Sequence, residues 1–123
     1  MTATMNNVNQ PEYLYSTARL LAVGKGNPEF VKRMLTVFVQ QMNDTTNQLN
    51  TYIHNPEQVY LILHQAKPSI ADICNPTMHQ LIEKIEILAK HNHTADMIKQ
   101  VQVFLQRIQE VIQAIHHFEL AED

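Results

Sequence analysis

Three Asn-Pro pairs constrain the fold of this chain more strongly than any other sequence feature. They are Asn27-Pro28, Asn55-Pro56 and Asn75-Pro76. An asparagine at the N-cap accepts a hydrogen bond from a free backbone amide of the first turn, and a proline at the first helical position has no amide that needs a partner. Glu29 and Glu57 follow two of the prolines, where the helix dipole favours a negative charge. The pairs therefore predict three helices that begin at these prolines.

Two further helix starts are less sharply marked. Pro11-Glu12 repeats the proline–acid pattern without an ideal cap, and it predicts a short first helix near 11–23, followed by a loop that contains Gly24 and Gly26. Thr94 precedes an acid and a long apolar period, which is the pattern of an N-cap at the start of the last helix. The sequence thus predicts five helices.

Apolar residues recur with the helical period of 3.6 in each long segment. The connections between these segments are short, so consecutive helices should run antiparallel. We expect an all-α fold: an up-and-down antiparallel four-helix bundle over about residues 28–119, with a short additional N-terminal helix packed across one end. In the last segment the apolar stripe consists of Met97, Val101, Phe104, Leu105, Ile108, Ile112 and Ile115.

Length and composition indicate one compact domain. A chain of 123 residues with 45% apolar residues can bury a single hydrophobic core. We expect residues 11–119 to form this domain, residues 1–10 to be a disordered or frayed N-terminus, and the acidic residues 120–123 to be a frayed tail. Cys74 is the single cysteine, so it cannot form an internal disulfide, and we expect a small packed residue.

Charge and hydropathy exclude two classes of partner. The net charge is −3 and no run of Lys or Arg occurs, so a footprint for nucleic-acid phosphates is missing. The longest apolar run, Val59–Leu63, is far shorter than the roughly 20 residues that a membrane span needs. The N-terminal residues have neither the basic nor the apolar region of a signal peptide. We expect a cytoplasmic protein with no nucleic-acid or membrane partner.

Pro68 breaks the pattern, because it lies inside the helix that begins at Pro56, where a proline usually costs about 3 kcal/mol. Its missing amide would have bonded the carbonyl of His64, four residues earlier. On a helical wheel His64 lies opposite the apolar stripe of this helix, and Lys67 and Pro68 lie on either side of it. We therefore expect an exposed histidine with a cation one turn away. The stripe consists of Val59, Ile62, Ala66, Ile70 and Ile73.

This arrangement suits phosphoryl transfer. A neutral imidazole is a nucleophile near pH 7, and the ammonium of Lys67 could offset the charge of a phosphoryl group on Nε2 of His64. Leu61 and Pro68 surround His64 with apolar surface, which is typical of a docking site. The same spacing is also typical of an ordinary solvated His/Lys pair, so spacing alone leaves both interpretations open.

The segment His64-Gln-Ala-Lys67-Pro68-Ser69 resembles the His-x-x-Lys-(Gly or Pro)-Ser motif of the histidine-containing phosphotransfer (HPt) domains of two-component phosphorelays. The resemblance extends over about residues 13–118. Upstream, a short helix, a glycine turn and the Pro-Glu-Phe start at residues 28–30 are similar to the opening of that family. Downstream, its fourth helix has matching positions at Leu81, Glu83 and Glu86.

The resemblance implies roles for five residues. His64 would accept the phosphoryl group, Lys67 would stabilise it, and Ser69 would support the motif. Glu86 matches a position where some members place a glutamine that faces the histidine, so its carboxylate would hold Nδ1–H of His64. Lys90 matches a second basic position of some members. Whether Glu86 and Lys90 contribute to the site is left open by the sequence.

The implied function is a relay of phosphoryl groups between receiver-domain aspartates, from a hybrid sensor kinase to a response regulator. Such a phosphocarrier has no ATP-dependent kinase activity of its own, and the sequence has no glycine-rich phosphate loop. No cofactor is expected, because magnesium would belong to the receiver partner. We expect a monomer whose cognate partners and pathway output cannot be read from the sequence. The docking residues would be Leu61, Gln65, Pro68 and Asp72.

Two other functions remain to be weighed. A non-phosphorylated helical adaptor that docks a receiver or a kinase would share every packing feature and differ only at His64. A metal site would have to use some of the 7 histidines. His91 with His93, and His116 with His117, are spaced so that their rings point in different directions, and no Glu-x-x-His pair occurs. The sequence also departs from the family, because Pro68 and Cys74 replace two glycines that are common there.

Overall fold

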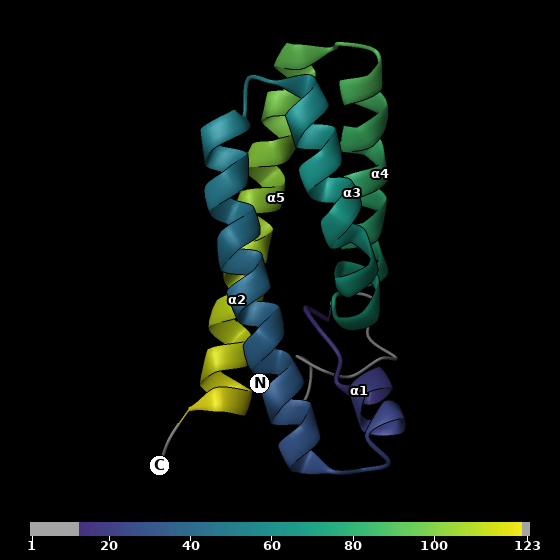
Figure 1. Ribbon diagram of the computed structural model, residues 1–123, viewed down its shortest axis with the longest axis vertical. Coiled ribbons are helices and arrows are strands. Elements are labelled where there is room, and N and C mark those ends of the chain that lie inside the picture. Colours follow the sequence, from purple (N-terminus) through teal and green to yellow (C-terminus); the bar gives the residue numbers. More distant parts are fainter. Residues whose placement is uncertain (1–12, 122–123) are drawn as a thin grey trace.

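The computed structural model describes residues 13–121, and most of these residues are helical (Figure 1). Four long helices follow one short helix, and a single turn of π-helix closes the series. The elements are α1 (Ala18–Val23), α2 (Pro28–Tyr52), α3 (Pro56–Ile73), α4 (Pro76–Lys90), α5 (Thr94–Ile115) and the π-helix η2 (His116–Leu120).

The three Asn-Pro starts are confirmed. The Asn27 side chain accepts hydrogen bonds from the amides of the first turn of α2. The Asn55 side chain accepts one from the amide of Gln58, and the Asn75 side chain accepts one from the amide of Met78. Each proline occupies the first helical position. Local capping chemistry therefore determines where α2, α3 and α4 begin.

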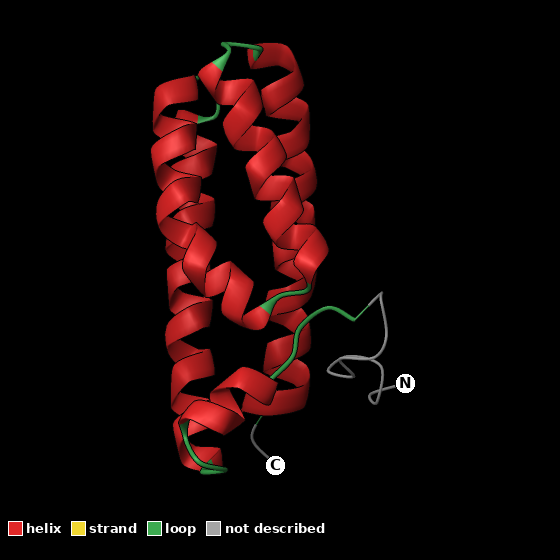
Figure 2. Cartoon of the chain, turned by 90° about the vertical axis from the view of Figure 1, so that its right-hand side faces the viewer, coloured by secondary structure: helices red, strands yellow, loops and turns green. Residues whose placement is uncertain are grey.

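Helices α2–α5 form the antiparallel four-helix bundle that the sequence predicts (Figures 1 and 2). Helices α2 and α5 have 25 and 22 residues, whereas α3 and α4 have 18 and 15. At 3.6 residues per turn the first pair is longer by about two turns. Figure 1 shows α1 below the ends of α3 and α4, where the shorter pair leaves room. No helix in the described part of the chain is both long and apolar enough to cross a membrane.

The N-terminal helix is shorter than predicted. It begins at Ala18, and residues 13–17 are not helical. The reason is that this segment pairs in extended form with the end of α3: the Ser16 amide donates to the Ile73 carbonyl at 2.8 Å, and Tyr15 forms an isolated bridge with Cys74. The proposed start at Pro11-Glu12 lies outside the described residues.

The end of the bundle differs from the prediction at two positions. Thr94 is the first residue of α5 and His93 is its N-cap. The Thr94 hydroxyl donates to the Asn92 carbonyl, so it does not cap the helix as predicted. Leu120, which was expected to belong to a frayed tail, ends the π-helix η2. The predictions for residues 1–10 and 122–123 concern residues outside the described part of the chain.

Candidate functional site

Helix α3 presents His64 outward, as its apolar stripe predicts. All five residues of the stripe are buried, and 56% of the His64 side chain is exposed. Pro68 lies inside α3, which continues to Ile73. The missing amide of Pro68 removes one donor for the carbonyl of His64. The histidine is therefore fixed on a regular helix with its ring at the surface.

Glu86 of α4 connects His64 to Lys67. Its Oε2 lies 2.8 Å from Nδ1 of His64, and its Oε1 lies 2.7 Å from Nζ of Lys67. Only 10% of the Glu86 side chain is exposed, against 21% of the Lys67 side chain. Lys67 is thus less exposed than the helical wheel predicts, because its ammonium reaches across to α4. One carboxylate holds both motif residues of α3.

The charges of this cluster stabilise one another. Burial acts to raise the pKa of Glu86, but the hydrogen bonds from Lys67 and His64 outweigh burial and lower that pKa below its usual value. The hydrogen bond to Glu86 raises the pKa of Lys67, although burial opposes it. Glu86 is therefore ionised and Lys67 protonated at neutral pH. An ionised carboxylate can only accept hydrogen bonds.

Tyr60 is a member of this cluster that sequence reasoning missed. Its ring stacks on the His64 ring, with centroids 5.4 Å apart and planes inclined by 11°. Nζ of Lys90 lies over the Tyr60 ring at 5.2 Å from the centroid, a cation–π contact. The signal that could have found Tyr60 is its spacing: it lies four residues before His64, on the same helix face.

Exposed apolar side chains lie on both helices that form the cluster. Leu61 is 47% exposed on α3 and Ile87 is 59% exposed on α4. A shallow hollow of about 400 Å³ lies beside Tyr60, between the start of α3 and the end of α4, and mainly apolar atoms line it. The lining residues are Pro56, Glu57, Tyr60, Leu61, Ala89, Lys90 and Asn92.

The remaining predicted site residues lie on α3 but outside this cluster. Gln65 and Pro68 are exposed. Asp72 is also exposed, and it forms an ion pair of 2.9 Å with Arg19 of α1. Ser69 is half-buried and lines a separate hollow between α1, α2 and α3. The structure therefore brings His64, Lys67, Glu86, Tyr60 and Lys90 together, and it does not bring Ser69 to His64.

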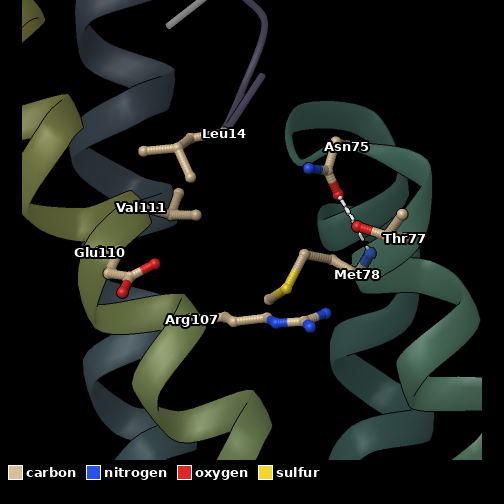
Figure 3. A pocket seen from close by; sticks show the side chains of 7 residues that line it. All are labelled: Leu14, Asn75, Thr77, Met78, Arg107, Glu110 and Val111. Carbon is tan, nitrogen blue, oxygen red and sulfur yellow. Dashed lines mark hydrogen bonds between the residues drawn. The ribbon is translucent and has the colours of Figure 1, made fainter. Parts of the chain in front are cut away.

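A second hollow, of about 290 Å³, lies between α4 and α5 near the extended segment (Figure 3). The Arg107 side chain extends across it from α5, and Met78 of α4 projects into it from the opposite side. None of the predicted site residues lines this hollow. The lining residues are Leu14, Asn75, Thr77, Met78, Arg107, Glu110 and Val111.

The histidine pairs do not form a metal centre among the described residues, where no group of three or more His, Cys, Asp or Glu side chains could hold an ion. Nδ1 of His91 lies 2.9 Å from the carbonyl of Ile87, at the end of α4. Cys74 is buried as predicted, and burial raises the pKa of its thiol to about 12. The thiol is therefore unreactive at neutral pH.

Comparison with known proteins finds no matching family model, no matching curated protein and no matching solved structure. The fold and the cluster themselves define the class: an all-α helical bundle in which the exposed His64 is held by a buried carboxylate of the neighbouring helix.

Proposed function

We propose that this chain is a histidine phosphotransfer protein. It relays a phosphoryl group between receiver-domain aspartates, from a hybrid sensor kinase to a response regulator, through His64. It is a phosphocarrier without ATP-dependent kinase activity. Its partners are proteins with an aspartyl phosphate or an acceptor aspartate, and the magnesium ion belongs to the receiver domain.

The observation that carries the proposal is the exposed His64 ring, of which only Nδ1 has a hydrogen-bonding partner among the described residues. With Nδ1 against Glu86 at 2.8 Å, the lone pair of the neutral ring is on Nε2. A nucleophile must present a lone pair to the reacting atom, and this one lies on an exposed helix face. The His–carboxylate pair supplies the nucleophile that a pure adaptor does not need.

The surroundings of His64 support a protein as the phosphoryl donor. Lys67 supplies a positive charge near the ring, which favours the developing charge of a transferred phosphoryl group. Leu61 on α3 and Ile87 on α4 are exposed apolar residues, and such surface favours a protein partner. Gln65, Pro68 and Asp72 complete the proposed docking surface on α3.

Treatment with a small phosphoramidate donor, followed by intact-mass measurement, tests the proposal without a known partner. Wild type should gain one acid-labile phosphoryl group, and His64→Ala should gain none. His79→Ala is the matched control, because Nδ1 of His79 also lies near a carboxylate, 3.7 Å from Glu83 on the same helix. That variant should be phosphorylated like wild type.

A positive result leads directly to a screen against receiver domains, in which the phosphoryl group should leave His64 for an aspartate. If wild type gains no phosphoryl group, or if His64→Ala gains the same one, the phosphocarrier loses its acceptor. The bundle would then be better explained as an adaptor that docks a receiver or kinase without being phosphorylated.

A further inference from the structure

The Tyr60 ring contacts two side chains that carry or can acquire a positive charge. The His64 ring is stacked on it, with the centroids 5.4 Å apart and the planes inclined by 11°, so the imidazole lies over the face of the tyrosine ring. Nζ of Lys90 lies 5.2 Å from the centroid of the same ring. The face of an aromatic ring carries partial negative charge and attracts a cation within about 6 Å of the centroid. Both contacts are within this range.

The carboxylate of Glu86 can supply only part of the stabilisation that a positive His64 ring needs. One of its oxygens lies 2.8 Å from Nδ1 of His64, and the other accepts a hydrogen bond of 2.7 Å from Nζ of Lys67. The ammonium of Lys67 therefore already offsets the negative charge of Glu86. The face of Tyr60 is a second group in contact with the ring that attracts positive charge.

Phosphorylation would give the His64 ring such a charge. The Nε2 lone pair of the neutral ring forms a bond to the phosphorus of an aspartyl phosphate. The bond from phosphorus to the carboxyl oxygen breaks, and its electron pair leaves with the aspartate carboxylate. The ring keeps its Nδ1 proton, so it becomes a cation when the phosphoryl group arrives and is neutral again when the group leaves. The face of Tyr60 attracts the cation more strongly than the neutral ring.

We propose that Tyr60 is a positioning residue whose ring face stabilises the positively charged state of His64, and that it thereby raises the share of the protein that holds a phosphoryl group at equilibrium. The proposal deepens the proposed function and rests on it for the phosphoryl step. The stabilisation applies to any positive charge on the ring, including the charge that a second proton brings.

Exchange with phosphoimidazole measures the stabilisation of the phosphorylated state. In a mixture of phosphoimidazole and imidazole, the bond from phosphorus to the donor ring breaks as the bond to Nε2 of His64 forms, and neutral imidazole leaves with the electron pair. Because the bonds broken and formed are of the same type, the equilibrium constant reports the surroundings of His64. Intact mass gives the phosphorylated fraction, which should be the same when equilibrium is approached from either side.

Tyr60→Leu should lower this equilibrium constant about two- to fivefold, which is the strength of an exposed cation–π contact expressed as a ratio. Tyr60→Met, which also has no aromatic face, should behave in the same way. Tyr60→Phe keeps the face and should stay close to wild type. Tyr52→Leu replaces an exposed tyrosine at the end of α2, and as the matched control it should leave the constant unchanged.

Titration of the unphosphorylated protein gives a readout that needs no phosphoryl donor. In acid, Nε2 of His64 takes a second proton and the ring becomes a cation, which ¹⁵N NMR of labelled protein detects. Tyr60→Leu should need a proton concentration about two to five times higher than wild type to form the cation, and Tyr60→Phe should not. The charged groups of the cluster, Glu86 and Lys90 of α4 and Lys67 of α3, are the same in every variant.

The proposal is overturned if Tyr60→Leu has the wild-type equilibrium constant for either reaction. It is also overturned if Tyr60→Phe is as weak as Tyr60→Leu, because the hydroxyl group and not the ring face would then be responsible. If wild type gains no phosphoryl group while the proton equilibria differ as expected, the proposed function is rejected and the stabilisation by Tyr60 is still supported. If wild type is phosphorylated and all constants are equal, His64 is still the acceptor and Tyr60 has no part in the reaction.

Discussion

Glu86 and Glu119 each connect separate parts of this bundle, but their surroundings differ. Glu86 connects α4 to α3 through His64 and Lys67. Glu119, in the π-helix η2, accepts a hydrogen bond of 2.6 Å from the hydroxyl of Tyr15. The donors near Glu86 include a ring that is open to solvent, whereas Tyr15 is completely buried.

The difference separates a contact of the proposed site from a contact that supports the fold. Burial, reinforced by the neighbouring Glu119 carboxylate, raises the pKa of Tyr15 well above its usual value, so the phenol stays neutral. The donors on Glu86 act in the opposite direction and lower its pKa. The Tyr15–Glu119 contact is therefore sensitive to base, and the contacts of Glu86 are sensitive to acid. Each can be broken separately.

The largest expected effect comes from removing the Tyr15 ring. Tyr15→Ala should lower the free energy of unfolding by about 3–5 kcal/mol, because it leaves a cavity where α1, the end of α3 and η2 meet. Chemical denaturation measures this loss. In the folded protein His64 should still accept a phosphoryl group, since the cluster around Glu86 is built from other residues.

Tyr13→Ala is the matched control, because Tyr13 lies on the same extended segment but is only half-buried. Its loss of stability should be clearly smaller. Equal losses for the two variants would contradict the assignment of Tyr15 as the anchor of this end of the bundle.

A smaller effect is expected from Tyr15→Phe, which keeps the ring and removes the hydrogen bond to Glu119. The free energy of unfolding should fall by about 1–2 kcal/mol, since a hydrogen bond to a charged acceptor is lost while Glu119 can still reach water. Denaturation at pH 7 measures this change. A loss as large as that of Tyr15→Ala would mean that the ring itself contributes little.

The same pair of proteins tests the sensitivity to base. A tyrosine whose folded pKa lies above its unfolded value of 10.0 contributes stability that is complete below pH 10 and is lost as the pH rises further. Wild type should therefore lose stability above pH 10, and Tyr15→Phe should lose less. Parallel curves for the two proteins would count against a neutral, buried phenol.

Replacing Glu86 should change the free energy of unfolding still less, and this change should vary with pH in the acid range. Because the folded pKa of Glu86 is lowered, its contribution is present above its usual value of 4.5 and is lost as the pH falls below it. Glu86→Gln should cost about 1 kcal/mol at pH 7 and less at pH 3. Denaturation at both pH values measures the difference, with Glu83→Gln as the exposed control.

The fold could be predicted from the sequence because its signals are local. Asn27, Asn55 and Asn75 cap helices whose first turns lie next to them in the chain, and the apolar period of α3 alone places His64 outward. The extended segment before α1 could not be predicted in this way. Its conformation depends on pairing with Cys74, far along the sequence.

The site residues show the same contrast between local signals and contacts with distant parts of the chain. His64 and Lys67 are recognisable by their spacing on one helix, whereas their common contact with Glu86 depends on how α3 and α4 pack. Only the resemblance pointed to Glu86, and nothing placed the Lys67 ammonium on its carboxylate. Ser69 was grouped with His64 by the motif, although its helix position turns it toward α1 and α2.

The smallest expected effect on stability belongs to Tyr60. Tyr60→Leu keeps apolar contact in a half-buried position and removes the stack on His64 and the cation–π contact with Lys90, so the cost should be below about 1 kcal/mol. The His64 ring should become more mobile and lose the ring-current shift of the stacked tyrosine, both of which NMR detects.

This variant also separates the two contacts on the His64 ring. The stack restricts rotation, but a ring face makes no distinction between Nδ1 and Nε2, whereas Glu86 contacts Nδ1 alone. Tyr60→Leu should therefore keep the proton on Nδ1 and lose the rigidity of the ring. If ¹⁵N NMR of this variant instead finds the ring proton on Nε2, the tautomer depends on how firmly the ring is held, and the carboxylate alone does not decide it.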